Sequence, residues 1–316
     1  MVNSLLLSVF YILVFPGFLF LAVGGFALEY VDRKLHARMQ HRVGPPWFQP
    51  AADFIKLVAK EELIPENVDR VIFKVTPLIA LTAATTAFFY IPLWSTNAPY
   101  AFEGDAVVVL YLLTIPTLCF FLGGWFSTSL YASIGSVRTL TQLFAYEVPL
   151  FMVILAPAVL AGSWSLSGMA AFYQEHPAYA LSNLPGFLVA VVVLLGKLEK
   201  VPFDIPEAET EIVGGTFTEY SGKLLAFFRM TVDIEAVVTA SLLAAVFLPW
   251  GLALPPLIAF ALYVLKVLLV IVMMTLMRSI FARLRIEQMV TFCWKWVAPA
   301  ALLQLLLSLV LSGVAR

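Results

Sequence analysis

Charged residues and cysteine are scarce in this chain of 316 residues. Only 12% of the residues are charged, whereas 62% are hydrophobic. The two cysteines, Cys119 and Cys293, both lie in apolar segments, and neither has a second cysteine nearby. A disulfide framework, a zinc site or an iron–sulfur site carried by this chain therefore lacks its ligands. The formal net charge of -1 offers no basic surface for nucleic acid.

Apolar runs long enough to cross a lipid bilayer recur along the whole chain. A helix needs about 17 to 25 mostly apolar residues to span the hydrocarbon. We predict a membrane span in each of eight runs: 5–28, 75–94, 106–126, 144–162, 184–201, 224–249, 255–278 and 292–313. No internal repeat or soluble domain separates these runs. The predicted fold class is therefore all-α, a polytopic membrane helical bundle in which residues 1–316 form a single integral membrane domain.

Lysine and arginine are absent from three of the connections between the predicted spans. The connections without them are 95–105, 163–183 and 250–254. The basic connections are 29–74, 127–143, 199–223 and 279–291. By the positive-inside rule, the basic loops face the cytoplasm. An even number of spans then places both termini outside.

The longest basic loop contains a second kind of helix. Phe54, Leu57 and Val58 fall on one helical face within residues 50–62, which predicts an amphipathic helix at the membrane interface. Such a helix can be a simple anchor. It can also line an opening from the bilayer or dock a soluble partner, and the residues alone leave these alternatives open.

The connection after the fifth predicted span is unusually acidic. Its carboxylates within 199–211 are Glu199, Asp204, Glu207, Glu209 and Glu211. Clustered carboxylates near lipid are expensive and are typical of ion handling. Helix capping is the competing explanation for Asp204 and Glu207, which are three residues apart with Pro206 between them. If 206–213 is helical, Glu207 and Glu211 lie one turn apart and repel, which predicts a raised pKa for at least one of them.

Glu147 lies in the first turn of the fourth predicted span, where an unpaired carboxylate must face the bundle interior or a wet cavity. A favourable position near the N-terminal end of the helix dipole is the structural alternative. Arg138 and Gln142 precede Glu147 at helical spacing and extend a polar path. Glu219, further along the acidic connection, adds another carboxylate to this set.

The sixth and seventh predicted spans also contain charges. Arg229 and Asp233 are four residues apart and can pair, with Glu235 slightly offset. A static ion pair and a proton relay are both compatible with this spacing. Lys266 lies in the middle of the seventh span, where it needs a carboxylate or water unless its long stem carries the amine to the interface.

Several motifs, in order along the chain, resemble one family of membrane subunits. The motifs are Asp32-Arg33-Lys34, Arg38-Met39-Gln40-His41-Arg42-Val43-Gly44-Pro45, Lys60-Glu61-Glu62-Leu63-Ile64-Pro65, Gly124-Trp125, Ala145-Tyr146-Glu147, Pro202-Phe203-Asp204-Ile205-Pro206-Glu207-Ala208-Glu209 and Thr218-Glu219-Tyr220-Ser221-Gly222. From about residue 29 onward, the chain resembles the membrane subunit that anchors the soluble arm of respiratory complex I. It also resembles the counterparts of that subunit in energy-converting membrane-bound hydrogenases.

Departures from the complex I pattern favour the hydrogenase-like branch. Pro45 is followed directly by Pro46-Trp47, without the longer glycine-containing insertion of complex I. This shortened form, together with Glu199-Lys200 before Val201-Pro202-Phe203-Asp204, resembles the hydrogenase-type complexes more closely. Lys197 stands where complex I tends to carry glutamate, and Val232 stands where it tends to carry an acidic residue. The roles of those two family positions therefore do not transfer directly to this chain.

The resemblance implies a coupling subunit of a redox-driven, ion-translocating respiratory complex in a prokaryotic cell membrane. It implies a coupling or proton path through Asp204, Glu207, Glu209, Glu211, Glu219, Glu147, Arg138, Asp233, Glu235 and Lys266. It implies docking of the soluble arm by Asp32, Arg33, Arg38, Arg42, Asp53, Lys56 and Glu61. As part of an oxidoreductase, the chain would have no catalytic centre, metal or cofactor of its own.

The implied partners are a hydrogenase-like large subunit, iron–sulfur subunits, small membrane subunits and antiporter-like subunits. Iron–sulfur clusters and a candidate [NiFe] centre would lie in those partners. In the complex I-like alternative, a quinone would enter between the first span and the amphipathic helix. A stand-alone secondary transporter and a passive anchor are the remaining alternatives.

Overall fold

The computed structural model describes residues 9–315, without the side chains of residues 209, 210, 314 and 315. The longer helices are α2 (Phe18–Met39), α3 (Gln49–Ala59), α4 (Arg70–Phe88), α5 (Asp105–Trp125), α6 (Leu130–Ala161), α9 (Leu184–Lys197), α11 (Gly222–Phe247), α12 (Pro256–Ile280) and α14 (Ala298–Ala315). The shorter ones are α7 (Leu166–Glu175), α8 (Pro177–Ser182), α10 (Glu209–Ile212) and α13 (Ile286–Phe292). A 3₁₀ turn covers Gly215–Phe217, and a π-helical turn covers Cys293–Val297. The described residues contain no strand, which confirms the predicted all-α membrane bundle.

Within the described part of the chain, seven helical segments are long and apolar enough to cross a membrane. They are Val9–Met39, Arg70–Phe88, Asp105–Trp125, Leu130–Ala161, Gly222–Phe247, Pro256–Ile280 and Ile286–Gly313. The predicted run 184–201 corresponds to α9, which has only 14 residues. At ~1.5 Å per residue, α9 is shorter than the ~30 Å hydrocarbon layer. It ends at Lys197 because Glu199 adopts a positive φ of 50° and Pro202 follows.

Several helix ends differ from those read from the apolar runs. The fourth span, predicted at 144–162, is the end of α6, which already begins at Leu130. Its first turns carry Arg138 and Gln142, so an apolar count places the start of this helix too late. The amphipathic helix predicted at 50–62 is α3, which ends at Ala59 because Lys60 is extended with ψ 148°.

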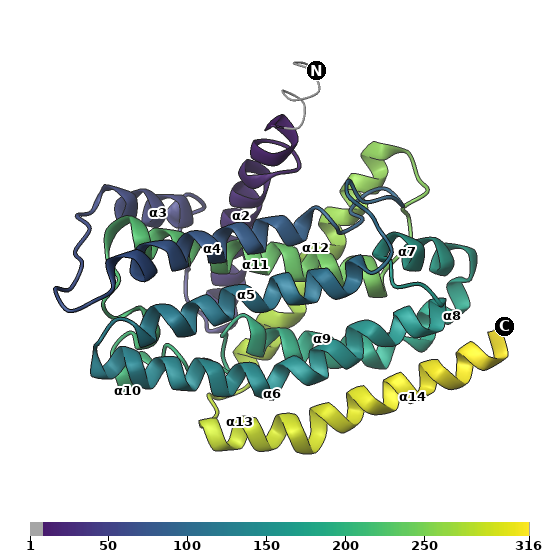
Figure 1. Cartoon of the computed structure of the whole chain (residues 1–316). Helices are drawn as coiled ribbons and strands as arrows, with labels where there is room; N and C mark the ends of the chain where they lie inside the picture. Colours follow the sequence, from purple (N-terminus) through teal and green to yellow (C-terminus); the bar gives the residue numbers. More distant parts are fainter. Residues whose placement is uncertain (1–8, 316) are drawn as a thin grey trace.

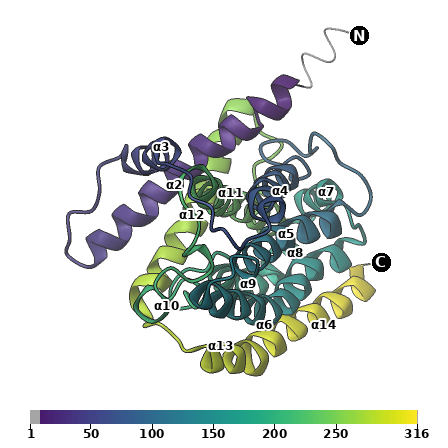
Figure 2. The same cartoon turned by 60° about the vertical axis from the view of Figure 1, so that its left-hand side comes forward.

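The bundle is built around α11, whose residues are buried almost continuously from Ile234 to Phe247. Helices α4, α5, α6 and α14 run side by side along the long axis of the molecule (Figure 1). Helices α2 and α12 cross this layer at a steep angle and contact both α11 and each other (Figure 1). α3 packs against α2 and α11 at one end of the bundle (Figure 2). That end is where the acidic connection lies.

The acidic loop, residues 198–221, is mostly irregular backbone fixed by its neighbours. The Leu284 amide donates a hydrogen bond of 3.0 Å to the Pro202 carbonyl, and the Arg283 guanidinium donates to the Asp204 carbonyl. Phe203 stacks on Phe292 with ring centroids 6.2 Å apart. The helix considered for 206–213 does not form, because only Glu209–Ile212 is helical, so Asp204 and Glu207 make no capping box.

Candidate functional site

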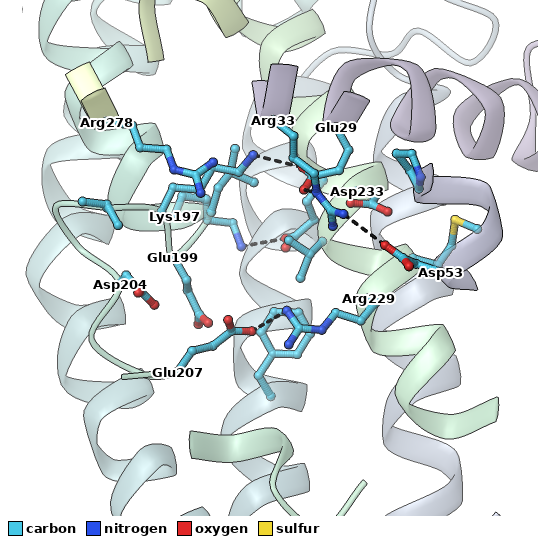
Figure 3. A pocket seen from close by; sticks show the side chains of 18 of the residues that line it. Glu29, Arg33, Asp53, Lys197, Glu199, Asp204, Glu207, Arg229, Asp233 and Arg278 are labelled. Atoms are coloured by element: carbon cyan, nitrogen blue, oxygen red, sulfur yellow. Dashed lines mark hydrogen bonds and ion pairs between the residues drawn. The ribbon is translucent and has the colours of Figure 1, made fainter. Parts of the chain in front are cut away.

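A cavity of about 610 Å³ lies between α2, α3, α11 and the acidic loop (Figure 3). Thirteen of its 21 lining residues are charged, seven acidic and six basic. Ligand pockets for small molecules are lined predominantly by apolar side chains, with only a few polar groups. This cavity, called the chamber below, is instead suited to water and mobile protons.

Asp32 organises the wall of the chamber where α2 meets α12. Its carboxylate accepts hydrogen bonds from Lys200 at 2.6 Å and from Arg278 at 2.8 Å. Thr275 donates to the other oxygen of Asp32 at 2.7 Å. Asp32, predicted to dock the soluble arm, is only 2% exposed, so its side chain is an internal partner for two cations. The cluster ties α2, α12 and the start of the acidic loop together.

A second charged cluster connects α2 to α3. The Arg33 guanidinium donates to Glu29 at 2.6 Å, within α2, and to Asp53 at 3.1 Å, on α3 (Figure 3). Gln49 donates to the other oxygen of Asp53 at 2.8 Å. Arg33 and Asp53, both predicted to dock the soluble arm, are thus half-buried at the chamber rim and hold the interfacial helix in place.

Two carboxylates of the acidic loop have separate arginine partners. Glu207 accepts from Arg229 of α11 at 2.7 Å, and Glu211 accepts from Arg138 of α6 at 2.6 Å. Arg229 therefore pairs with Glu207 of the acidic loop and not with Asp233, the partner that helical spacing allowed. The hydrogen bond from Arg138 lowers the pKa of Glu211, which is opposite to the rise considered for this residue. The side chain of Glu209 lies outside the described part of the structure.

Glu199 and Asp233 both point into the chamber (Figure 3). Within the described residues, neither carboxylate has a hydrogen bond or ion pair, in contrast to Glu207 nearby. Burial, followed by the charge of Glu207, raises the pKa of Glu199 to about 8. A carboxyl group that titrates near neutral pH can accept and release protons under working conditions.

The deepest ion pair of the chamber wall was not predicted from the sequence. Lys197, the last residue of α9, donates to Glu235 of α11 at 2.7 Å, and each side chain is 1% exposed. Lys197 also donates to the Thr117 hydroxyl at 2.8 Å, and Thr117 lies 3.1 Å from the Tyr146 hydroxyl. The available sequence signal was a lysine at the end of an apolar run, which in a bundle needs a counter-ion.

Glu147 is half-buried on α6 and accepts a hydrogen bond of 2.6 Å from the Thr114 hydroxyl of α5. Gln142, proposed to continue the path from Arg138, donates to the Gly196 carbonyl at 2.7 Å instead. Glu147 is thus in contact with α5, whereas Gln142 is in contact with the end of α9, so the two side chains do not share a hydrogen bond.

Besides Arg138, Glu147 and Glu211, two further members of the predicted path lie apart from the chamber lining. Lys266 donates to the Trp250 carbonyl just beyond the end of α11, so its stem carries the amine to the helix end as snorkelling requires. Glu219 is half-buried in the acidic loop. Neither residue lines the chamber.

The remaining predicted docking residues lie on the surface around α3. Arg38, Arg42, Lys56 and Glu61 are all exposed. Val43 and Trp47, in the connection between α2 and α3, are 77% and 76% exposed. This surface, called the α3 surface below, combines charge with uncovered apolar side chains. Among the described residues, no group of three or more His, Cys, Asp or Glu side chains can hold a metal ion.

Fold and site together define a polytopic membrane protein that encloses a charged chamber at one end. The chain belongs to the NADH dehydrogenase family, whose model matches residues 10–309. It is 32% identical to a subunit of the NADH-quinone oxidoreductase of Carboxydothermus hydrogenoformans, over 90% of this chain and 83% of that protein. It is 34% identical to NADH-quinone oxidoreductase subunit 8 of Thermus thermophilus, over 88% of this chain and 80% of that protein.

A solved structure of an archaeal respiratory complex, the membrane-bound sulfane sulfur reductase, contains a similar chain. The TM-score is 0.84 at 28% identity, covering 92% of this chain and 96% of that one. These comparisons confirm the resemblance based on the motifs. The protein is therefore a membrane subunit of a complex I-like, ion-translocating respiratory complex, and as such a subunit of an oxidoreductase.

Proposed function

We propose that this chain couples electron transfer in a hydrogenase-like soluble arm to the movement of protons or sodium ions across the membrane, without binding a quinone. The observation that carries the proposal is the charged lining of the chamber. A quinone has an apolar ring and tail, which call for apolar walls with a few placed polar groups. In the chamber, charged side chains outnumber all others.

The α3 surface is the proposed docking site for the soluble arm. Exposed Trp47 and Val43 supply apolar contact, and Arg38 and Arg42 supply charge close by. Interfaces typically combine such aromatic anchors with a polar rim. The basic loops then lie in the cytoplasm. Both termini lie outside, because α9, although short, still carries the chain from the α8 end of the bundle to the acidic loop (Figure 1). The proposed partners are a hydrogenase-like large subunit, iron–sulfur subunits that carry the clusters, small membrane subunits and antiporter-like subunits.

Coupling would run from the acidic loop into the bundle. A change of charge or position in the soluble arm would be felt by Glu207 and Glu211, whose arginine partners lie on α11 and α6. Moving Arg229 would change the field at Asp233, which lies four residues further along α11 in the chamber wall. Glu147 would receive the proton on α6, beside Thr114 of α5.

The first experiment is purification of the tagged chain in mild detergent, with mass spectrometry and activity assays. We expect a hydrogenase-like large subunit, iron–sulfur proteins and antiporter-like subunits to co-elute. We expect hydrogen evolution or reduction of a sulfur compound, and no quinone reduction. Quinone reduction by the purified complex would favour the complex I-type alternative. Elution of the chain by itself would favour a stand-alone secondary transporter.

The coupling path is tested by replacing Glu147 or Glu211 with Gln in the assembled complex. We expect ion pumping to be uncoupled from electron transfer, or both to stop, while the subunits still assemble. The control is Glu175→Gln, because Glu175 is an exposed glutamate at the far end of the bundle. Full coupled pumping in a well-assembled Glu147→Gln or Glu211→Gln complex would refute the proposed path.

A further inference from the structure

Lys197 and Glu235 form the boundary between the chamber and the bundle interior. Both residues line the chamber, and both side chains are 1% exposed. On the chamber side lie the carboxylates of Glu199 and Asp233, which have no ion-pair partner among the described residues. On the inner side lies the Thr117 hydroxyl, which accepts from Lys197 at 2.8 Å. A proton that enters the bundle from the chamber along this route must pass the ion pair.

The inner side of the pair continues toward Glu147 along one face of α5. Thr114 and Thr117 are three residues apart, so their side chains are neighbours on the helix surface. Thr114 donates to Glu147 at 2.6 Å. The buried Tyr146 hydroxyl lies 3.1 Å from the Thr117 hydroxyl. One water molecule between the two threonine hydroxyls would complete a hydrogen-bonded route from Lys197 to Glu147.

We propose that Lys197 is a proton carrier of this chain, passing a proton from Glu235 at the chamber wall to Glu147 on α6, beside Thr114 of α5. The inference rests on the proposed coupling function and assigns one of its steps to a residue that the sequence analysis left without a role. Lysine suits this step because a buried ammonium loses its proton far more readily than a guanidinium does.

The transfer conserves protons and charge at each stage. A proton from the chamber adds to the Glu235 carboxylate, which becomes neutral. The Lys197 ammonium has then lost its counter-ion, and it releases one proton through the Thr117 hydroxyl toward Glu147. The resulting neutral amine takes the proton held by Glu235. The ion pair is restored, and one proton has moved from the chamber to Glu147.

A purely structural role for the pair predicts different behaviour. Buried ion pairs add little net stability compared with well-packed apolar residues. A pair kept only for packing would therefore tolerate any cation that fits opposite Glu235. A carrier requires a cation that can give up its proton. Arginine separates the two cases, since its guanidinium is not deprotonated in proteins.

The test is Lys197→Arg in the intact complex, reconstituted in liposomes and driven with the electron acceptor found in the purification assay. Electron transfer and the movement of protons, followed with a pH-sensitive dye, are measured together. We expect the variant to assemble. We expect the number of protons moved per electron to fall at least about tenfold, because a guanidinium stays protonated. The matched control is Lys74→Arg, in an exposed pair with Glu62 whose atoms are 3.9 Å apart.

A second variant covers the case in which the larger guanidinium prevents assembly. Lys197→Gln combined with Glu235→Gln keeps hydrogen-bonding groups at both positions without charge, and we expect it to assemble without pumping. Wild-type pumping by either assembled variant would overturn the carrier role and leave the pair a structural one. Movement of sodium ions without protons by the wild-type complex would also overturn the carrier role. Absence of both proton and sodium movement in the wild-type complex would instead refute the proposed coupling function, so the two failures are distinguishable.

Discussion

Asp32 shows how one buried carboxylate can hold three elements together. It accepts from Lys200, from Arg278 and from Thr275, and its side chain is 3% exposed. Asp32→Asn leaves Arg278 without its carboxylate and leaves Lys200 with only the 3.3 Å contact to Glu29. Removing one partner of a buried ion pair typically costs about 3 to 5 kcal/mol, so we expect a loss of that order in the free energy of unfolding. Denaturant unfolding in detergent measures it.

Asp53 provides the comparison for this prediction. Its ion pair with Arg33 is about two-fifths exposed on both sides, at 40% and 41%. Exposed pairs contribute at most about 1 kcal/mol, so Asp53→Asn should change the unfolding free energy little. Equal losses for the two variants would mean that burial does not determine the strength of the Asp32 cluster.

Glu199 gives the chain a predictable response to pH. Burial raises its pKa from an ordinary value of 4.5 to about 8, with the Glu207 carboxylate as the second cause. Between these values the folded chain keeps a proton that the unfolded chain releases, so folding stability falls as pH rises through this window. A glutamine at position 199 does not titrate, so the Glu199→Gln variant lacks this loss of folding stability. The midpoint of thermal unfolding of Glu199→Gln should therefore gain on wild type from about pH 5 to about pH 8.

Below pH 4.5 the wild-type protein and the Glu199→Gln variant both carry an uncharged group at position 199. This pH range is therefore the internal reference for the comparison. The difference between the two unfolding midpoints should be smallest there and level off above pH 8. A difference that stays constant across this range would show that the Glu199 carboxyl is not held in its neutral form by burial.

At the scale of elements, the acidic loop depends on Gly215, a position that no other residue fits without strain. Gly215 has a positive φ of 55°, and a Cβ built on it would lie 1.8 Å from the Pro206 carbonyl oxygen. Left-handed backbone alone costs about 1–2 kcal/mol for other residues. Gly215→Ala should loosen residues 198–221 and reduce coupling while the helices persist. Hydrogen exchange of this loop in the intact complex measures the loosening.

Gly313 is the matched control, because a Cβ on it meets no atom within 4 Å and its backbone is helical. Gly313→Ala should leave exchange in the acidic loop unchanged. If Gly215→Ala also left that exchange unchanged, the loop would owe its shape to the contacts of Phe203 and Arg283 and not to the backbone at Gly215.

The helices also show what an apolar count can and cannot predict. It located the membrane-crossing elements, because an unbroken apolar run leaves few other structures for the backbone in lipid. It overestimated α9, since the turn at Glu199 to Pro202 depends on backbone conformation and not on hydropathy. It also missed the early turns of α6, which are polar and still helical.

Ion-pair partners were harder to predict than helices, for a physical reason. Helical spacing favoured Arg229 with Asp233, but Glu207 is 22 residues away in sequence and forms the contact. Arg278 and Asp32 are 246 residues apart, and Lys197 and Glu235 are 38 apart. Such partners are set by how whole helices pack, which local periodicity does not encode. The sequence nevertheless indicated the acidic loop and most of the carboxylates that gather near the chamber.

At the scale of the whole molecule, the two ends of the bundle differ in charge, and this difference makes the orientation testable. The end with α3 and the acidic loop carries the basic connections, whereas the opposite end, with α7 and α8, carries the connections that lack lysine and arginine (Figure 1). The positive-inside rule therefore places Arg42 in the cytoplasm and Asn97 outside.

Both of these residues are exposed, so Arg42→Cys and Asn97→Cys should each react with a membrane-impermeant maleimide from one side only. We expect Arg42→Cys to be labelled in inverted vesicles and Asn97→Cys in right-side-out cells. Background should be low, because the native Cys119 and Cys293 are 4% and 3% exposed. The reverse pattern would put the α3 surface outside the cell, where cytoplasmic redox subunits cannot reach it, and would refute the proposed docking.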